Sequence, residues 1–196
     1  MEAIVPLVLE GRFVRLEPLE RRHEAALALV AVDEELWRYF TSSLATPDGL
    51  RRWIDTALDN AARGTELPFA TVELATGTVA GGTRVMDIQY AHDTVEIGAT
   101  WLGRAWWRTA INSESKYLLL RHLFDTIGCR RVSLKTDLLN TRSQRAIERL
   151  GAVREGVLRK HMLVQGGRSR DTVYYSILDD EWPQTRKNME RNLYKG

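Results

Sequence analysis

The stretch from residue 68 to residue 102 constrains the fold most, because its apolar residues recur with a period of two. The runs PFATVEL, VAGGTRVMDIQY and VEIGATWL are separated by the short turns ATGT and AHDT. Runs of this period joined by tight turns are typical of neighbouring antiparallel strands. The sequence therefore predicts a three-stranded antiparallel meander. Gly98, inside the third run, predicts a bulge or the close approach of another backbone.

Helical patterns and further strands follow the meander. Residues 111–127 form an apolar helical face that ends at Gly128, residues 130–137 read as a strand, and a short helix is expected between Asn140 and Gly151. The last expected elements are strands over 152–164 and 169–178, joined by the turn QGG, and a helix over 179–193. Strands connected through helices pair in parallel, so the sheet should be mixed and the fold of the α/β class.

The residues before the meander read as one strand followed by three helices. These elements are expected over 12–19, 20–30, 33–40 and 46–64. Thr46 is a plausible cap for the third helix, with Pro47 at its first position and Gly64 at its end. The whole pattern predicts a central sheet of about seven strands flanked by helices.

The composition fits one globular domain over residues 1–196, with 44% hydrophobic and 28% charged residues. Cys129 is the single cysteine, which excludes a disulfide framework, and no cluster of His and Cys indicates a metal site. No apolar run approaches the ~18 residues that a membrane helix needs. We therefore expect a cytoplasmic protein without a metal and without a membrane partner.

Charge is distributed unevenly along the chain. Residues 1–100 contain 9 Lys and Arg against 16 Asp and Glu, a net charge of −7, whereas residues 101–170 contain 15 against 5, a net charge of +10. A basic segment can attract nucleic acid or a small polyphosphate, although it can also be a set of solvated helix faces. The basic residues lack interleaved aromatic platforms and any groove-reading motif, so nucleic acid is not the expected partner.

The joint WWRTAINSESK, residues 106–116, lies between the last strand of the meander and the long apolar helix. The first turn of a helix leaves backbone N–H groups without partners, and together with the helix dipole these groups attract anions. A phosphate is therefore a candidate ligand at this joint, to which Arg108 and Lys116 could add positive charge. Water or a capping side chain is the alternative occupant of such a helix end.

Four segments resemble the GNAT superfamily of acyl-CoA-dependent N-acetyltransferases. They are VEIGATWL, WWRTAINSESK, GCRRVSLKTDLLNTRSQRAIERLGAVREGVLRKHMLV and GRSRDTVYYSILDDEW. The RimJ/RimL type, the branch of ribosomal-protein N-terminal acetyltransferases, is the most similar, and the resemblance extends from about Leu9 to Trp182. It implies a splayed sheet in which strand 94–102 parts from strand 131–137, with acetyl-CoA between them as co-substrate.

The pyrophosphate loop of the superfamily, Q/R-x-x-G-x-G/A, aligns with residues 107–112, which contain neither the initial Gln or Arg nor either glycine. Ala110 still allows fairly close backbone approach, and Asn112 tolerates unusual dihedral angles. We expect coenzyme A to bind with a rearranged phosphate cradle. The expected cofactor-binding residues are Trp101, Leu102, Trp107, Arg108, Thr109, Ala110, Ile111, Asn112, Ser113, Lys116, Asn140, Arg142 and Arg145.

The resemblance also suggests how acetyl transfer to an amine would be assisted. A backbone N–H between Ala99 and Trp101 would stabilise the oxyanion. Relatives often use a tyrosine to protonate the thiolate, but none lies between residues 140 and 151, so Ser143 is the candidate, with a purely structural role in the first helical turn as its alternative. Glu96 is the candidate base, against the alternative of a solvated side chain.

Other side chains have alternative roles in this scheme. His122 and His161 are alternative bases, although a lone histidine in a leucine-rich helix or a strand is more often structural. Trp101, Trp106 and Trp107 could line the cleft or belong to the core.

The acceptor is expected between the early helices and the strands that follow the splay. The −7 balance of residues 1–100 favours a cationic amine, such as a protein N-terminus, a polyamine or an aminoglycoside. A catalytically silent coenzyme A sensor or ribosome-associated binding module is the second hypothesis, because the glycines of the loop are absent. Homodimers are common in the resembled branch, so a homodimer is one assembly that the resemblance allows.

Overall fold

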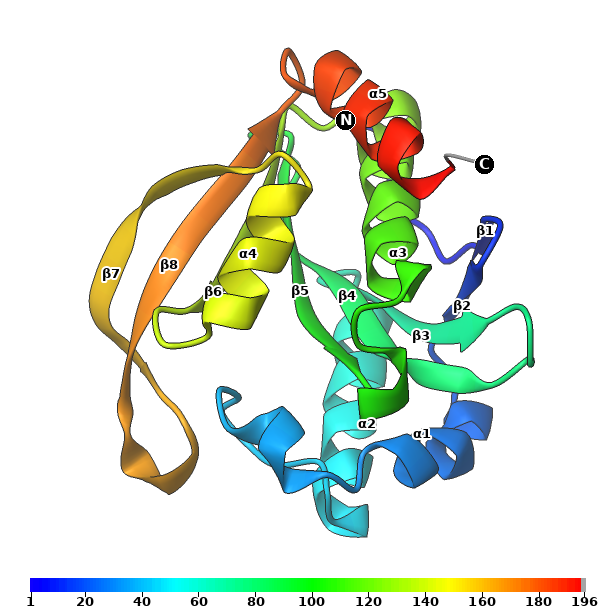
Figure 1. Ribbon diagram of the computed structural model, residues 1–196, viewed down its shortest axis with the longest axis vertical. Helices are drawn as coiled ribbons and strands as arrows, with labels where there is room; N and C mark the ends of the chain where they lie inside the picture. Colours follow the sequence, from blue (N-terminus) through cyan, green and yellow to red (C-terminus); the bar gives the residue numbers. More distant parts are fainter. Residues whose placement is uncertain (195–196) are drawn as a thin grey trace.

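The computed structural model describes residues 1–194, which form one eight-stranded sheet in the order β1-β2-β3-β4-β5-β6-β8-β7 (Figure 1). The strands are β1 (Leu9–Glu10), β2 (Val14–Pro18), β3 (Leu67–Glu73), β4 (Val79–Gln89), β5 (Thr94–Leu102), β6 (Arg131–Asp137), β7 (Val153–Leu163) and β8 (Ser169–Leu178). Neighbours are antiparallel except β5 and β6, which are parallel. The predicted meander and mixed sheet are confirmed, but parallel pairing forms only through the helix after β5, because β8 lies between β6 and β7. The strand that the sequence did not indicate is the two-residue β1.

The described residues contain five α-helices: α1 (Glu24–Val30), α2 (Pro47–Ala62), α3 (Ala110–Arg121), α4 (Thr141–Arg149) and α5 (Trp182–Leu193). Thr46 caps α2 as predicted, since its hydroxyl accepts from the N–H of Gly49. The helix expected over 33–40 is wrong in extent, because only a 3-10 helix over Glu34–Trp37 forms. Packing decides this conformation: the fully buried Trp37 donates its indole N–H to the carbonyl of Ala31.

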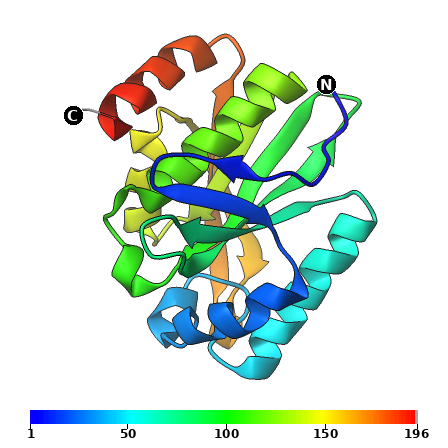
Figure 2. The same ribbon diagram turned by 90° about the vertical axis from the view of Figure 1, so that its right-hand side faces the viewer.

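Two hydrophobic cores lie on opposite faces of the sheet. The first packs α3, α4 and α5 against the sheet and includes Leu118, Ile147 and Met189. The second packs α1 and α2 against the other face and includes Leu27 and Ile54. Figure 2 shows α5 beside α3 at one end of the molecule and α1 and α2 at the other. The sheet is therefore the middle layer of three.

The long helix after the meander changes geometry near its end. Past Arg121 it continues as a π-helical segment, His122–Ile127, and Gly128 ends it in the left-handed conformation at φ 77°. Glycine adopts this conformation without steric cost, which explains why the predicted stop at Gly128 is confirmed. None of the helices in residues 1–194 has the length and apolar character needed to span a bilayer.

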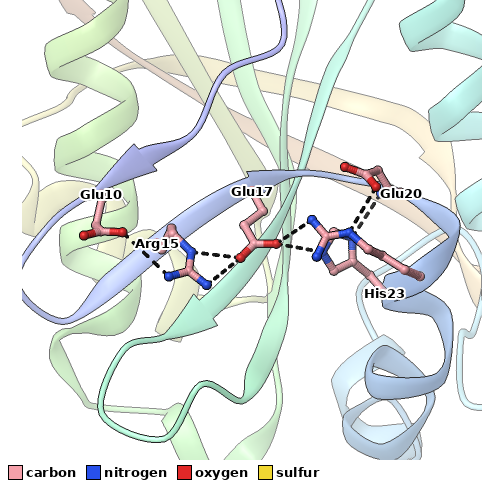
Figure 3. Close-up of polar contacts among 6 residues, drawn as sticks. Glu10, Arg15, Glu17, Glu20 and His23 are labelled. Carbon is pink, nitrogen blue, oxygen red and sulfur yellow. Dashed lines mark hydrogen bonds and ion pairs between the residues drawn. The ribbon is translucent and has the colours of Figure 1, made fainter.

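A buried carboxylate links β2 to the segment that precedes α1 (Figure 3). Glu17 is 8% exposed and pairs with Arg15 at 2.7 Å, Arg22 at 2.8 Å and His23 Nε2 at 3.1 Å. The backbone N–H of Glu20 donates to His23 Nδ1, so the ring proton lies on Nε2 and is donated to Glu17. Burial raises the pKa of Glu17, but hydrogen bonds from Arg15 and His23 and the two arginine charges outweigh it and hold the pKa at about 2.

This network predicts how stability depends on pH. Because the pKa of Glu17 in the folded state lies below its ordinary value of 4.5, the carboxylate stabilises the fold above that pH and loses this contribution as the pH falls toward about 2. Replacing Glu17 with Gln is expected to lower the free energy of unfolding by roughly 2 kcal/mol at about pH 7 and by much less at about pH 3. Urea titrations of both proteins check this, and an equal loss at both pH values would contradict it.

Candidate active site

Strands β5 and β6 run side by side at one end and then part (Figure 1). They pair only where Thr94–Glu96 face Arg131–Ser133, whereas β6 pairs with β8 along its whole length. The splay predicted between these two strands is therefore confirmed. Glu96 is the last residue of β5 that pairs with β6, so it marks the point at which the strands separate.

A bulge interrupts β5 just beyond the splay. Gly98 faces Arg84 and Trp101 faces Gly82, so Ala99 and Thr100 together lie opposite one residue of β4. The expected bulge is confirmed, but its left-handed residue is Ala99, at φ 48°, rather than Gly98. A Cβ on Gly98 would lie 2.7 Å from Met86 Sδ and 2.8 Å from Glu96 Oε1, so the close approach at this glycine comes from side chains.

The turn between β5 and α3 has the geometry of a tight helix entry. Arg108 adopts a left-handed conformation at φ 64°, and Thr109 is the extended N-cap of α3. The Thr109 hydroxyl accepts from the N–H of Ile111 and donates to the carbonyl of Trp106. Within residues 1–194, no other side chain accepts from an N–H of this first turn. The remaining first-turn amides, at Ala110 and Asn112, therefore face the end of the helix without a side-chain cap.

Trp107 connects this turn to the start of α4. Its indole N–H donates to the carbonyl of Leu102 at 2.9 Å, which fixes the ring at the end of β5. The guanidinium carbon of Arg142, in the first turn of α4, lies 3.5 Å from the ring centroid, and that of Arg104 lies 5.2 Å away. The structure thus brings together Trp107 and Arg142 from opposite sides of the splay. Arg145 is an exposed residue of α4.

The first turn of α4 confirms the predicted cap. The side-chain oxygen of Asn140 accepts from the N–H of Ser143 at 3.1 Å. The Asn140 side-chain amide donors and the half-buried Ser143 hydroxyl form no hydrogen bond with any residue that the structure describes. Both groups are available to a ligand.

Four residues proposed from the sequence as cofactor contacts have buried side chains: Trp101, Leu102, Ile111 and Lys116. Trp101 is 4% exposed and packs edge-on against Trp37 and Trp53 in the second core. Lys116 is 5% exposed, and its Nζ donates to the hydroxyls of Thr83 and Thr100. A phosphate contact needs an ammonium group at the surface of the turn, and the structure does not place Lys116 there.

The predicted base forms an ion pair that sequence reasoning missed. Glu96 is 3% exposed, and its Oε2 lies 2.9 Å from Lys135 Nζ. Burial lowers the pKa of Lys135, but the hydrogen bond and charge of Glu96 outweigh it, so the pKa is raised and the lysine stays charged. Alternation along β6 was the available signal: Ser133 pairs with Glu96, and Lys135 follows on the same face.

The two histidines named as alternative bases, His122 and His161, occupy different environments. His122 is half-buried in the π-helical segment after α3, and burial lowers its pKa. His161, on β7, is exposed, and its Nδ1 lies 3.1 Å from the hydroxyl of Thr172. Its ring meets Tyr174 edge-on at 5.8 Å, and Tyr174 faces Lys135 across β6 and β8. His161 is therefore connected to Glu96 through a series of contacts on one face of the sheet.

Comparisons with known proteins agree with this arrangement. The model of the family described as "Acetyltransferase (GNAT) domain" matches residues 14–153. The solved structure of a GCN5-related N-acetyltransferase from Brucella melitensis is 33% identical, with a TM-score of 0.90 over 98% of this chain and 87% of that chain. Mycobacterium smegmatis RimJ, solved in complex with CoA-disulfide, has the same fold at 21% identity, with a TM-score of 0.78 over 91% of this chain and 88% of that chain.

A curated relative matches about half of the chain. YdaF of Bacillus subtilis (strain 168), whose name describes it as a candidate ribosomal N-acetyltransferase, is 28% identical over 106 residues. That alignment covers 54% of this chain and spans 57% of the length of YdaF. The family match, the splayed sheet and the tight entry into α3 lead to the same conclusion. The chain belongs to the GNAT family of acetyltransferases.

Proposed function

We propose that the protein is an acetyl-CoA-dependent N-acetyltransferase that acetylates a primary amine by direct attack in a ternary complex. The observation that carries this proposal is the parting of β5 and β6 immediately before the turn that leads into α3. It combines a gap between two strands with a helix N-terminus whose first-turn amides lack a side-chain cap, apart from Ile111. Amides in this position favour the phosphates of a nucleotide.

The residues present fit acetyl-CoA even though the loop lacks glycines. Left-handed backbone at Arg108 supplies the turn, and its exposed guanidinium supplies positive charge. The residues that would hold the pyrophosphate are Trp107, Arg108, Thr109, Ala110, Asn112 and Ser113. Ile111, also expected from the sequence, is not among them, because its N–H is bonded to the Thr109 hydroxyl and its side chain is buried. Asn140 would bind the pantetheine arm through its free amide donors, and Arg142 and Arg145 would reach the adenosine phosphates.

Each part of the reaction has a candidate group in this chain. Acetyl-CoA supplies the activated thioester carbonyl. Backbone N–H groups between Ala99 and Trp101 would stabilise charge on its oxygen, and Glu96 would take the proton of the attacking amine through water. As the new C–N bond forms and the C–S bond breaks, Ser143 would donate its hydroxyl proton to the departing thiolate and regain one from solvent.

Replacing Ser143 with Ala is expected to lower kcat by about tenfold or more, because the thiolate then leaves without a proton donor. The acetyl-CoA dissociation constant should change little, since the cap that Asn140 provides uses the backbone N–H of Ser143. Steady-state kinetics combined with calorimetric titration check both values. A variant with the wild-type kcat would show that this serine is structural.

Charges near Glu96 bear on the choice of acceptor. Lys135 pairs with Glu96, and the Nε of Arg170, on β8, donates to the hydroxyl of Thr172. Two cations therefore lie near Glu96 on the same face of the sheet. A polyamine or aminoglycoside carries several positive charges and would be repelled. A peptide N-terminus carries one charge followed by carbonyl groups, which such cations can bind, and the name of YdaF and the likeness to RimJ favour the same class. We therefore propose a protein N-terminus as the acceptor.

A thiol-release assay with acetyl-CoA and a panel of peptides, polyamines and aminoglycosides tests the function. We expect coenzyme A release that depends on a peptide with a free N-terminus and is absent with the same peptide blocked. Release with polyamines alone would contradict the proposed acceptor. Binding of acetyl-CoA without turnover on any acceptor would instead indicate a coenzyme A sensor.

A further inference from the structure

Lys116 is a buried cation without a carboxylate partner. It lies on α3, is 5% exposed, and its Nζ donates to the hydroxyls of Thr83 on β4 and Thr100 on β5. Within residues 1–194, no acidic side chain lies within ion-pair distance of this ammonium group, whereas Lys135 has Glu96 at 2.9 Å. Burial accordingly lowers the pKa of Lys116 to about 7.

Burial of such a group is costly. Removing an ammonium ion from water without a compensating charge is strongly unfavourable. A methionine or leucine would fill the same volume without that cost, so packing alone does not account for a lysine here. What the ammonium group contacts is therefore the informative feature.

The contacts of Lys116 lead to the bulge of β5. The Thr100 hydroxyl, which accepts from Lys116, lies 3.3 Å from the carbonyl oxygen of Gly98 and 2.7 Å from the Thr83 hydroxyl. Gly98 and Thr100 flank Ala99, the residue at φ 48°. A left-handed alanine is strained and persists only when its surroundings fix it. These hydrogen bonds therefore connect Lys116 to the two residues, Gly98 and Thr100, that lie on either side of the strained Ala99.

We propose that Lys116 is a positioning residue, whose bond to Thr100 fixes the β5 bulge and whose charge lies behind the backbone N–H groups that would meet the thioester carbonyl. This inference rests on the proposed function, because it assigns those N–H groups to the oxyanion. It differs from the phosphate contact expected from the sequence, since Lys116 acts through Thr100 and does not touch the nucleotide.

Two variants and one control separate this role from simple packing. Lys116→Met keeps an unbranched side chain that is one atom shorter and removes the charge, and Thr100→Val keeps the branched shape and removes the hydroxyl. Ser115→Ala is the matched control, because Ser115 is equally buried on α3 but bonds only to the carbonyl of Ile111. If Lys116→Met fails to fold, Thr100→Val still tests the proposal.

The first measurement uses the unliganded protein. Amide hydrogen exchange at Ala99, Thr100 and Trp101 is expected to be at least about tenfold faster in Lys116→Met and Thr100→Val than in wild type, and unchanged in Ser115→Ala. The melting temperature of Lys116→Met should be equal to or above that of the wild type, because a buried charge is removed. Unchanged exchange at the bulge would overturn the proposal.

The second measurement uses infrared spectroscopy of bound acetyl-CoA labelled with ¹³C at its thioester carbonyl. The wild type and Ser115→Ala should shift the carbonyl stretch to lower frequency, and both test variants should lose part of that shift and at least about tenfold in kcat, with KM nearly constant. A shift that is present but insensitive to both variants would overturn this inference and leave the proposed function intact. Failure of wild type to bind acetyl-CoA would overturn both.

Discussion

Glu96→Gln is expected to lower kcat by about 100-fold while leaving the affinity for acetyl-CoA nearly unchanged. The carboxylate is buried at the point where β5 and β6 part, and an amide of the same shape cannot take the proton of the attacking amine. The limb of the pH–rate profile that reports the base should disappear with it. Thiol-release kinetics over a pH series check the rate and the profile together.

The ion pair with Lys135 requires a control. If Glu96 served only to hold Lys135, then Lys135→Met would lower kcat as much as Glu96→Gln. Under either role of Glu96, Lys135→Met leaves a buried carboxylate without its partner and destabilises the fold. We expect Lys135→Met to raise KM for the peptide and to keep the pH limb. Equal kcat losses in the two variants, with an unchanged pH profile, would rule out the role of Glu96 as base.

Glu114→Ala is expected to lower the free energy of unfolding by about 3–5 kcal/mol. Glu114 is fully buried on α3 and accepts from the backbone N–H groups of Arg12, Phe13 and Val14 at 2.6–2.9 Å and from the Tyr194 hydroxyl at 2.8 Å. Removing the carboxylate leaves these donors without an acceptor at the β1–β2 turn. Urea denaturation followed by circular dichroism measures the loss.

Glu190→Ala is the matched control for this prediction. Glu190 also links a helix to a tyrosine, since it accepts from the Tyr117 hydroxyl at 2.6 Å, but its side chain is 36% exposed. Its loss should cost less than about 1 kcal/mol. Equal effects of the two substitutions would mean that Glu114 does not organise the turn.

Local signals in the sequence account for most of the correct predictions about the fold. Period-two runs predicted β3, β4 and β5, and the caps at Thr46 and Asn140 predicted where α2 and α4 begin, because such signals involve residues only a few positions apart. The helix predicted over 33–40 was wrong for the opposite reason. Its conformation depends on burial of Trp37 against distant residues.

The site shows the same division between local and long-range information. The helix entry after β5 and the Asn140 cap of α4 follow from nearby sequence. The bond between Lys116 and Thr100 joins a helix to a strand, and periodicity gives no information about its partner. Trp101 likewise faces the second core because the bulge at Ala99 changes which side of β5 the following residues occupy.

A crystal structure of the protein in complex with coenzyme A tests the central claim most directly. We predict the pantetheine arm between β5 and β6, with the pyrophosphate within hydrogen-bond distance of the N–H groups of Ala110 and Asn112. Coenzyme A bound elsewhere would contradict the claim. In such a complex, the contact between Trp107 and Arg142 would still bridge the gap between β5 and β6, with no ligand between the strands.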